Sequence, residues 1–329
     1  MANNITLTLA CGDYEITRPL IDGTVKPDGI DLVVLSNMDS TTRHWRYLRN
    51  REFDMAETSA SSYIVAKDRG MPIDALPVFP HRRFRHGFIY VNTSSGITNP
   101  ADLVGRRVGI KSYLVTAGHW LRGILQDEYG VHHQSIRWVT ELDEDIDFTP
   151  PPGLDISRLP NDASVEAMLA KGDLDAVIHS SLIKPFLAGD PRVARLFADY
   201  RREEEKYFAK TAIFPIMHVL AINREIVDKY PWVTINMYHA FNQAKAIAMK
   251  RMENPRVMPL AWQRHAWEEQ QRLLGPDPWE YGLGARNRHN IDTLARYSFE
   301  QGLTSRLLSA QDLFLAVDQG RKRGEEFRI

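Results

Sequence analysis

The feature that most constrains the fold of this chain is a repeated order of short apolar strand, polar loop and helix. Strands are predicted at residues 6–10, 53–56, 107–110 and 175–178, and each one runs into a polar loop. Helices are predicted to follow, over roughly 63–69 and 116–125 among others. Because strands that alternate with helices usually pair in parallel through crossover connections, the pattern predicts the α/β class.

The chain length indicates more than one folding unit. At 329 residues the chain is too long for one ordinary hydrophobic core. We predict two α/β lobes with a ligand cleft between them: a discontinuous first lobe of residues 1–92 plus 220–329, with C-terminal helices, and an inserted second lobe of residues 93–219. Residues 84–91 and 213–222 are expected to be the two strands that cross between the lobes. The acidic, proline-containing stretch 143–152 is expected to be a surface loop.

Charge and apolar patterning exclude several classes of partner. The formal net charge is −1, so no overall basic field draws the protein to nucleic acid or to an anionic membrane. No stretch of about 18 apolar residues is present, which excludes a membrane span. Because Ile5 opens an alternating segment with no signal-like region before it, we expect a cytoplasmic protein. The single cysteine, Cys11, excludes an internal disulfide, and the oligomeric state is left open.

The polar loops at the strand ends are the expected ligand site. Open parallel sheets bind ligands beyond the carboxyl ends of their strands, where helix N-termini favour anions. Any one serine in these loops has an alternative interpretation as a helix cap, but four such loops in one chain favour a shared cleft. The binding residues predicted on this basis are Asp13, Arg18, Ser59, Ser61, Ser62, Lys111, Ser112, Tyr113 and Ser180.

A cluster of arginines is the strongest candidate for binding a carboxylate. Arg82, Arg83 and Arg85 lie close together, and guanidinium groups pair with carboxylates in a bidentate manner. In an extended segment Arg83 and Arg85 share a face, so not all three can point into the cleft. The alternative is a solvated edge carrying surface ion pairs.

Three histidines are candidates for proton transfer. His86, His179 and His218 lie near the predicted crossings or at a strand end, and histidine titrates near neutral pH. Glu57, Asp13 or Tyr113 is a candidate for orienting one of them. A buried histidine satisfied by backbone groups remains the alternative for each. Cys11 is expected to be a buried thiol, and Trp45 to be a core residue.

No cofactor is expected from the sequence. No histidines or carboxylates have the close helical spacing of a zinc site. Gly282-Leu283-Gly284 lacks the third glycine of a dinucleotide fingerprint, and no phosphate-binding loop motif occurs. We therefore predict neither a metal nor an organic cofactor.

Several stretches along the chain resemble one family. They are residues 10–15 (ACGDYE), 52–59 (EFDMAETS), 80–86 (PHRRFRH), 214–218 (FPIMH), 277–283 (DPWEYGL) and 300–303 (EQGL). In this order they resemble the 4,5-dihydroxyphthalate decarboxylase family, a branch of the type II periplasmic-binding-protein fold. The resemblance implies a bilobal fold and non-oxidative decarboxylation of a dihydroxylated aromatic dicarboxylate.

The implied chemistry sets three requirements for the site. A hydroxyl lies para to each carboxylated ring carbon, so protonation of that carbon gives a dienone-like intermediate that loses carbon dioxide. The site then needs a cationic group for the remaining carboxylate, an acid near the ring carbon and a base near the para hydroxyl. The expected partner is a small anionic aromatic substrate. The competing hypothesis is a solute-binding protein for such an acid that performs no catalysis.

Overall fold

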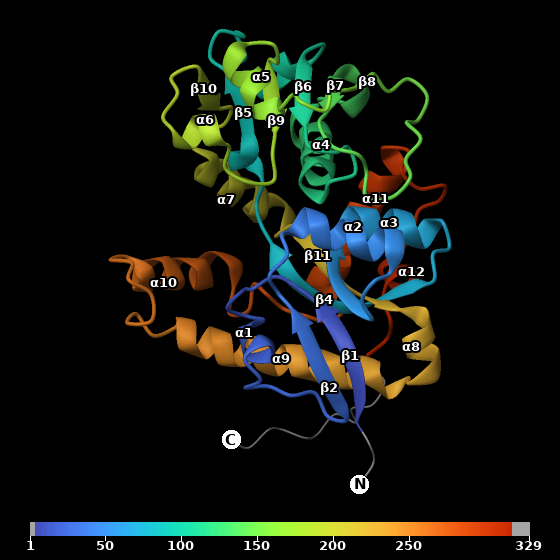
Figure 1. Ribbon diagram of the computed structural model, residues 1–329. Coiled ribbons are helices and arrows are strands. Elements are labelled where there is room, and N and C mark those ends of the chain that lie inside the picture. The colour runs from blue at the N-terminus through green and yellow to red at the C-terminus, as the bar shows by residue number, and fades with distance from the viewer. Residues whose placement is uncertain (1–3, 318–329) are drawn as a thin grey trace.

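Each of two lobes contains one sheet, which confirms the predicted two-lobed α/β architecture (Figure 1). The computed structural model describes residues 4–317. The sheet of the first lobe has the order β2-β1-β3-β11-β4, formed by β1 Ile5–Ala10, β2 Ile30–Leu35, β3 Met55–Ser59, β4 Ile73–Arg82 and β11 Ile216–Asn223. The sheet of the second lobe has the order β10-β5-β9-β6-β7-β8, formed by β5 Ile89–Asn92, β6 Arg107–Ile110, β7 Arg137–Thr140, β8 Ile156–Arg158, β9 Ala176–Ile178 and β10 Val193–Arg195.

Helices pack around both sheets. They are α1 Arg18–Ile21, α2 Ser40–Asn50, α3 Ala60–Asp68, α4 Thr116–Tyr129, α5 Val165–Lys171, α6 Lys184–Leu187, α7 Tyr200–Thr211, α8 Arg224–Lys229, α9 Trp232–Met252, α10 Gln263–Leu274, α11 Ala285–Glu300 and α12 Ala310–Leu313. Among the residues that the structure describes, no helix is long and apolar enough to cross a bilayer.

Both sheets are mixed, in contrast to the purely parallel sheets that the alternation suggested. β1 pairs in parallel with β2 and β3, whereas β11 runs antiparallel to both β3 and β4. In the second sheet β5 is antiparallel to β9 and β10. The reversed strands are β5 and β11, and each of them follows a crossing between the lobes. A chain that arrives from the other lobe enters the sheet from the opposite end, so its strand runs antiparallel to its neighbours.

The outgoing crossing is not the continuous strand predicted over residues 84–91. β4 ends at Arg82, a 3₁₀ turn covers His86–Phe88, and β5 begins at Ile89. Side chains satisfy the backbone here in place of a strand ladder: the Gly87 N–H donates to Glu204 over 3.3 Å, and Arg195 Nε donates to the Gly87 carbonyl over 3.0 Å.

The sheets also correct the lobe boundaries predicted at residues 92 and 220. β5 belongs to the sheet of the second lobe, so that lobe begins before residue 93. All of β11, from Ile216 onward, pairs within the sheet of the first lobe.

The edge strand β4 is protected by the C-terminal part of the chain. Gly282 donates its N–H to the Pro77 carbonyl over 2.8 Å, and Leu315 donates to the Ala75 carbonyl over 2.9 Å. Proline has no N–H to donate and is tolerated on edge strands. The covered edge therefore offers no template for pairing with another chain.

Candidate active site between the lobes

The described residues form a pocket where the two lobes face each other, and this pocket is partly open to solvent. Sites for small molecules are typically concave and lie between domains in this way. From the first lobe and the outgoing crossing come Ser40, Thr41, His44, Trp45, Ser59, Arg85, Met217 and His218; from the second come Lys111, Ser112, Val115, Thr116, Ala117, Leu142, Asp143, Asp145 and Ser180. Polar loops from both halves of the molecule therefore meet at one pocket.

His218 lies at the base of this pocket, and Glu57, which does not line the pocket, hydrogen-bonds to it. The two residues lie on the neighbouring antiparallel strands β11 and β3, and Nδ1 of His218 hydrogen-bonds to Oε1 of Glu57. A carboxylate on one ring nitrogen fixes the tautomer and the orientation of an imidazole, and it leaves the other nitrogen free for chemistry. The sequence-based suggestion that Glu57 orients a histidine agrees with this geometry.

Glu57 is completely buried and stays ionised because three hydrogen-bond partners and the Arg43 guanidinium group surround it. The Gly12 N–H donates to Oε2 over 2.6 Å and the Tyr14 hydroxyl to Oε1 over 2.8 Å, while Nη2 of the buried Arg43 lies 2.9 Å from Oε2. Burial by itself raises the pKa of Glu57, but the charges of His218 and Arg43 and the hydrogen bonds outweigh it, so its pKa lies well below the usual range.

Burial lowers the pKa of each histidine of the cluster. Burial lowers the pKa of His218, and the positive charges of Arg43 and Arg85 add to this effect while Glu57 opposes it. His44 and His81 pack against His218 with ring centroids 4.8 and 4.7 Å apart. Burial lowers the pKa of both, that of His81 to about 2. Because its pKa is lowered, protonated His218 gives up its proton more readily than a free imidazolium does.

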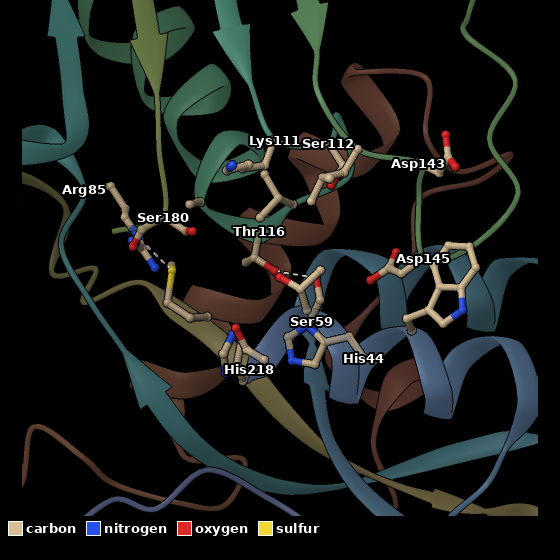
Figure 2. A pocket seen from close by; sticks show the side chains of 17 residues that line it. His44, Ser59, Arg85, Lys111, Ser112, Thr116, Asp143, Asp145, Ser180 and His218 are labelled. Atoms are coloured by element: carbon tan, nitrogen blue, oxygen red, sulfur yellow. Dashed lines mark hydrogen bonds between the residues drawn. The ribbon is translucent and has the colours of Figure 1, made fainter. Parts of the chain in front are cut away.

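The cationic side of the pocket is formed by Arg85 and Lys111 (Figure 2). Arg85 is 2% exposed, and its guanidinium group donates to the Ser180 carbonyl over 2.8 Å and contacts Met217 Sδ at 2.9 Å. Within residues 4–317 no carboxylate lies within ion-pair distance of Arg85. A buried guanidinium group without a counter-ion favours an anionic ligand. Lys111 is paired with Glu141 at the edge of the same side.

Hydroxyl groups connect the two lobes across the floor. Ser59 Oγ lies 2.8 Å from Thr116 Oγ1, and Ser61 Oγ lies 3.0 Å from the same atom. Ser59 also caps helix α3, by accepting the N–H of Ser62. Ser59 therefore fits both interpretations, because it caps α3 and also lines the pocket.

Of the residues predicted from sequence, six line the pocket and the others do not. Those that line it are Ser59, Arg85, Lys111, Ser112, Ser180 and His218. Ser61 and Ser62 lie just behind its wall, where Ser61 Oγ donates to the Leu114 carbonyl and Ser62 Oγ to Asp145. Tyr113 is buried under the ring-stacked Phe148, with Arg122 over its ring.

Two of the three arginines proposed to clamp a carboxylate point elsewhere, which corrects that prediction. Arg82 is buried on the far side of the sheet, where it donates to Asn287 Oδ1 over 2.5 Å and to the Glu280 carbonyl over 2.9 Å. Arg83 is exposed and lies over the Phe88 ring. The guanidinium groups of Arg83 and Arg85 both lie over the Phe88 ring, but of the two only Arg85 lines the pocket.

Two predicted histidines and the loop after β1 are also outside the pocket. His86 is buried between Phe197 and Tyr207. The His179 ring folds back on its own loop and accepts the Ser181 N–H at Nδ1 over 3.1 Å. His179 therefore does not lie where the predicted acid–base role would require. Its ring binds the loop that carries Ser180 instead. Asp13 and Arg18 pair with each other on the surface, 2.8 Å apart.

Sequence reasoning missed His44 and Asp145. His44 lies on α2, which follows β2 and forms a fifth strand–helix junction of the kind that identified the other loops. Asp145 lies in the stretch that was expected to be a surface loop, but this stretch folds back over the pocket. Trp45 is 40% exposed at the pocket mouth and is not a core residue.

No group of three or more histidine, cysteine, aspartate or glutamate side chains in residues 4–317 has the arrangement of a metal site. Cys11 is fully buried, as expected for a structural thiol, and burial raises its pKa to about 12.

The two-lobed fold and the pocket between the lobes define a protein of the periplasmic-binding-protein class. Residues 28–213 match the family described as the periplasmic substrate-binding protein of a phosphonate ABC transporter. The fold is shared with the aliphatic sulphonate binding protein SsuA from Escherichia coli, with a TM-score of 0.54, 16% identity, and coverage of 98% of this chain and 96% of that one. It is also shared with the desulfurization enzyme DSZB, with a TM-score of 0.53, 15% identity and coverage of 96% of each chain.

Within this class the chain belongs to the 4,5-dihydroxyphthalate decarboxylase family. It is 35% identical over 321 residues to the 4,5-dihydroxyphthalate decarboxylase of Comamonas testosteroni, covering 95% of this chain and 97% of the relative.

Proposed function

We propose that this protein decarboxylates a hydroxylated aromatic dicarboxylate such as 4,5-dihydroxyphthalate, giving protocatechuate and carbon dioxide. The family supports this activity, since the relative from Comamonas testosteroni matches over nearly its whole length and bears that name. The structural support for this proposal is that one pocket contains both His218 and Arg85. Glu57 holds His218 in position, and Arg85 is a buried cation without a counter-ion in the described residues.

Two of the three groups that this reaction needs, the cation and the acid, come from Arg85 and His218. Arg85, with Lys111 beside it, holds the carboxylate that stays on the ring. Protonated His218 delivers its proton to the ring carbon that bears the other carboxylate, and a C–H bond forms there. The C–C bond to that carboxylate then breaks, its electron pair returns to the ring, and carbon dioxide leaves. His218 regains a proton from solvent.

The direct test is to incubate the purified protein with 4,5-dihydroxyphthalate and to measure carbon dioxide and protocatechuate. His218→Asn is expected to lower kcat by about 10²–10⁴-fold, the usual contribution of a general acid, with a smaller change in KM. Arg85→Ala is expected to raise KM by about 10–100-fold, since it removes a charge-assisted contact to the substrate.

Arg83→Ala is the matched control, because Arg83 is an exposed arginine two residues away that does not line the pocket. It is expected to keep both constants near the wild-type values. Tight binding of the acid with no turnover in the wild-type protein would instead favour the solute-binding function.

A further inference from the structure

The pocket has an acidic side opposite its cationic side. Figure 2 shows Arg85 at one end, Asp145 at the other, and His218 with Ser59 between them. Asp145 comes from the loop between β7 and β8 of the second lobe. A ligand that fits this arrangement is anionic at one edge and carries hydrogen-bond donors at the opposite edge.

Asp145 is held in place by the first lobe. Its two carboxylate oxygens accept a hydrogen bond from Ser62 Oγ, at 2.8 and 3.0 Å, and Ser62 Oγ in turn lies 3.1 Å from Ser59 Oγ. Nearby, Arg49 on α2 donates to Asp147 Oδ1 over 2.7 Å and to the Glu144 carbonyl over 3.0 Å. The loop is therefore fixed against α2 and α3 at the positions on both sides of Asp145.

Asp145 lacks a cationic partner. In the described part of the chain no lysine, arginine or histidine forms an ion pair with it, whereas its neighbour Asp143 pairs with Arg158 at 3.3 Å. Desolvation of a carboxylate is costly unless donors satisfy its remaining lone pairs. Ser62 supplies one donor, so the carboxylate keeps acceptor capacity toward the pocket.

We propose that Asp145 is the specificity residue that recognises the ring hydroxyls of the substrate. Its carboxylate accepts hydrogen bonds from hydroxyl groups on the ring edge opposite the carboxylates, while Arg85 binds the carboxylate edge. This inference rests on the proposed function, because it takes the ligand to be a hydroxylated aromatic acid. One of these hydroxyls lies para to the carbon that His218 protonates, so the same hydrogen bond stabilises the positive charge that develops on that hydroxyl when the ring carbon is protonated.

Equilibrium binding tests this role without depending on turnover. In the His218→Asn background turnover is slowed by about 10²–10⁴-fold, so binding of phthalate and of 4,5-dihydroxyphthalate can be measured before much reaction occurs. The Kd of phthalate divided by the Kd of 4,5-dihydroxyphthalate measures how strongly the site selects for the hydroxyls. Asp145→Asn is expected to lower this ratio at least about tenfold, since a charge-assisted hydrogen bond is lost. Phthalate itself should bind equally well or more tightly, because a negative charge has been removed from the pocket.

Asp155→Asn is the matched control, because Asp155 is an exposed carboxylate of the same loop that does not line the pocket. It is expected to leave the ratio unchanged. An unchanged ratio in Asp145→Asn, or an equal loss of affinity for both ligands, would overturn the proposal and leave Asp145 with a purely structural role.

The two proposals fail in different ways. Absence of carbon dioxide release by the wild-type protein, together with the expected ratio, would refute the decarboxylase function while the hydroxyl recognition stands. Circular dichroism and the phthalate Kd report whether the Asp145→Asn protein is folded, and Asp145→Ser supplies a second variant that removes the charge with a small side chain.

Discussion

At the scale of single residues, Glu57 positions His218 but does not itself line the pocket. A buried carboxylate is stable only when it is paired and hydrogen-bonded. Here Gly12, Tyr14 and His218 supply the hydrogen bonds and Arg43 supplies the opposite charge. The glycine is required sterically, because a Cβ at position 12 would lie 2.4 Å from the Tyr14 ring. The motif around Cys11 thus serves to bring the Tyr14 hydroxyl to Glu57.

Glu57→Gln is predicted to lower kcat by about 10–100-fold with little change in KM, because Glu57 acts on His218 and not on the substrate. The charge of Glu57 raises the pKa of His218. Its loss lowers that pKa further, so the limb of the pH–kcat profile that reports His218 should move to lower pH. Steady-state kinetics across pH measure this. Glu52→Gln, on the exposed loop before β3, is the control, and a profile that moves to higher pH would contradict the assignment.

At the scale of elements, the loop between β7 and β8 contacts the start of α4 in the second lobe and helices α2 and α3 of the first lobe. Its Glu144 carboxylate accepts the N–H groups of Tyr113 and Leu114, at 2.5 and 2.9 Å, where the chain enters α4. Arg49 and Ser62 of the first lobe hold the positions around it. Burial raises the pKa of Glu144 to about 7, although the two backbone hydrogen bonds oppose this effect.

This raised pKa predicts a pH-dependent stability cost. A carboxyl group with a higher pKa in the folded than in the unfolded state binds its proton more tightly when folded, so its contribution to stability falls as pH rises from about 4.5 to about 7. Glu144→Gln cannot ionise. Its free energy of unfolding relative to wild type should therefore be higher at pH 8 than at pH 5, by about 2 kcal/mol.

Urea denaturation at the two pH values measures this difference. Asp147→Asn, an exposed carboxylate of the same loop, is the control and should show the same difference from wild type at both. A relative stability of Glu144→Gln that falls between pH 5 and pH 8 would refute the prediction.

At the scale of the whole molecule, the lobes are joined by more than the two crossings. Helix α11 contacts both α3 of the first lobe and α4 of the second, and it lies between the lobes in Figure 1. The Tyr297 hydroxyl donates to Asp127 Oδ2 over 2.7 Å, and the Trp120 ring stands edge-on to the Tyr297 ring. Trp120 Nε1 also donates to the Ile216 carbonyl at the start of β11, over 2.8 Å.

The close approach of α4 and α11 requires a glycine at position 123. A Cβ there would lie 2.2 Å from carbons of the Tyr297 ring, so one helix must shift. Alanine is favoured over glycine inside a helix by about 1 kcal/mol, but overpacking costs ~1–3 kcal/mol and occasionally more. Gly123→Ala is therefore predicted to lower the free energy of unfolding by about 1–2 kcal/mol. Chemical denaturation measures it, and a variant as stable as wild type would show that α11 is not tightly packed there.

The sequence by itself determined the fold class and about a third of the residues that line the pocket. Polar residues that follow an apolar strand must lie at the end of that strand. This local rule located Ser59, Lys111, Ser112 and Ser180, and His218 was found by its place in a predicted crossing; all five line the pocket. The resemblance to the decarboxylase family, carried by short stretches along the chain, was confirmed by the relative from Comamonas testosteroni.

Only the tertiary structure decided the direction of side chains in irregular segments and the path of the long loop. Arg82, Arg83 and Arg85 are equivalent in sequence, but the backbone leaves the strand after Arg82. Of the three only Arg85 lines the pocket, where it contacts Met217 Sδ and the Ser180 carbonyl. Asp145 reaches the pocket because Ser62 and Arg49, distant in sequence, bind its loop. Strand periodicity is a local property of the backbone, whereas these orientations depend on contacts between residues far apart in the chain.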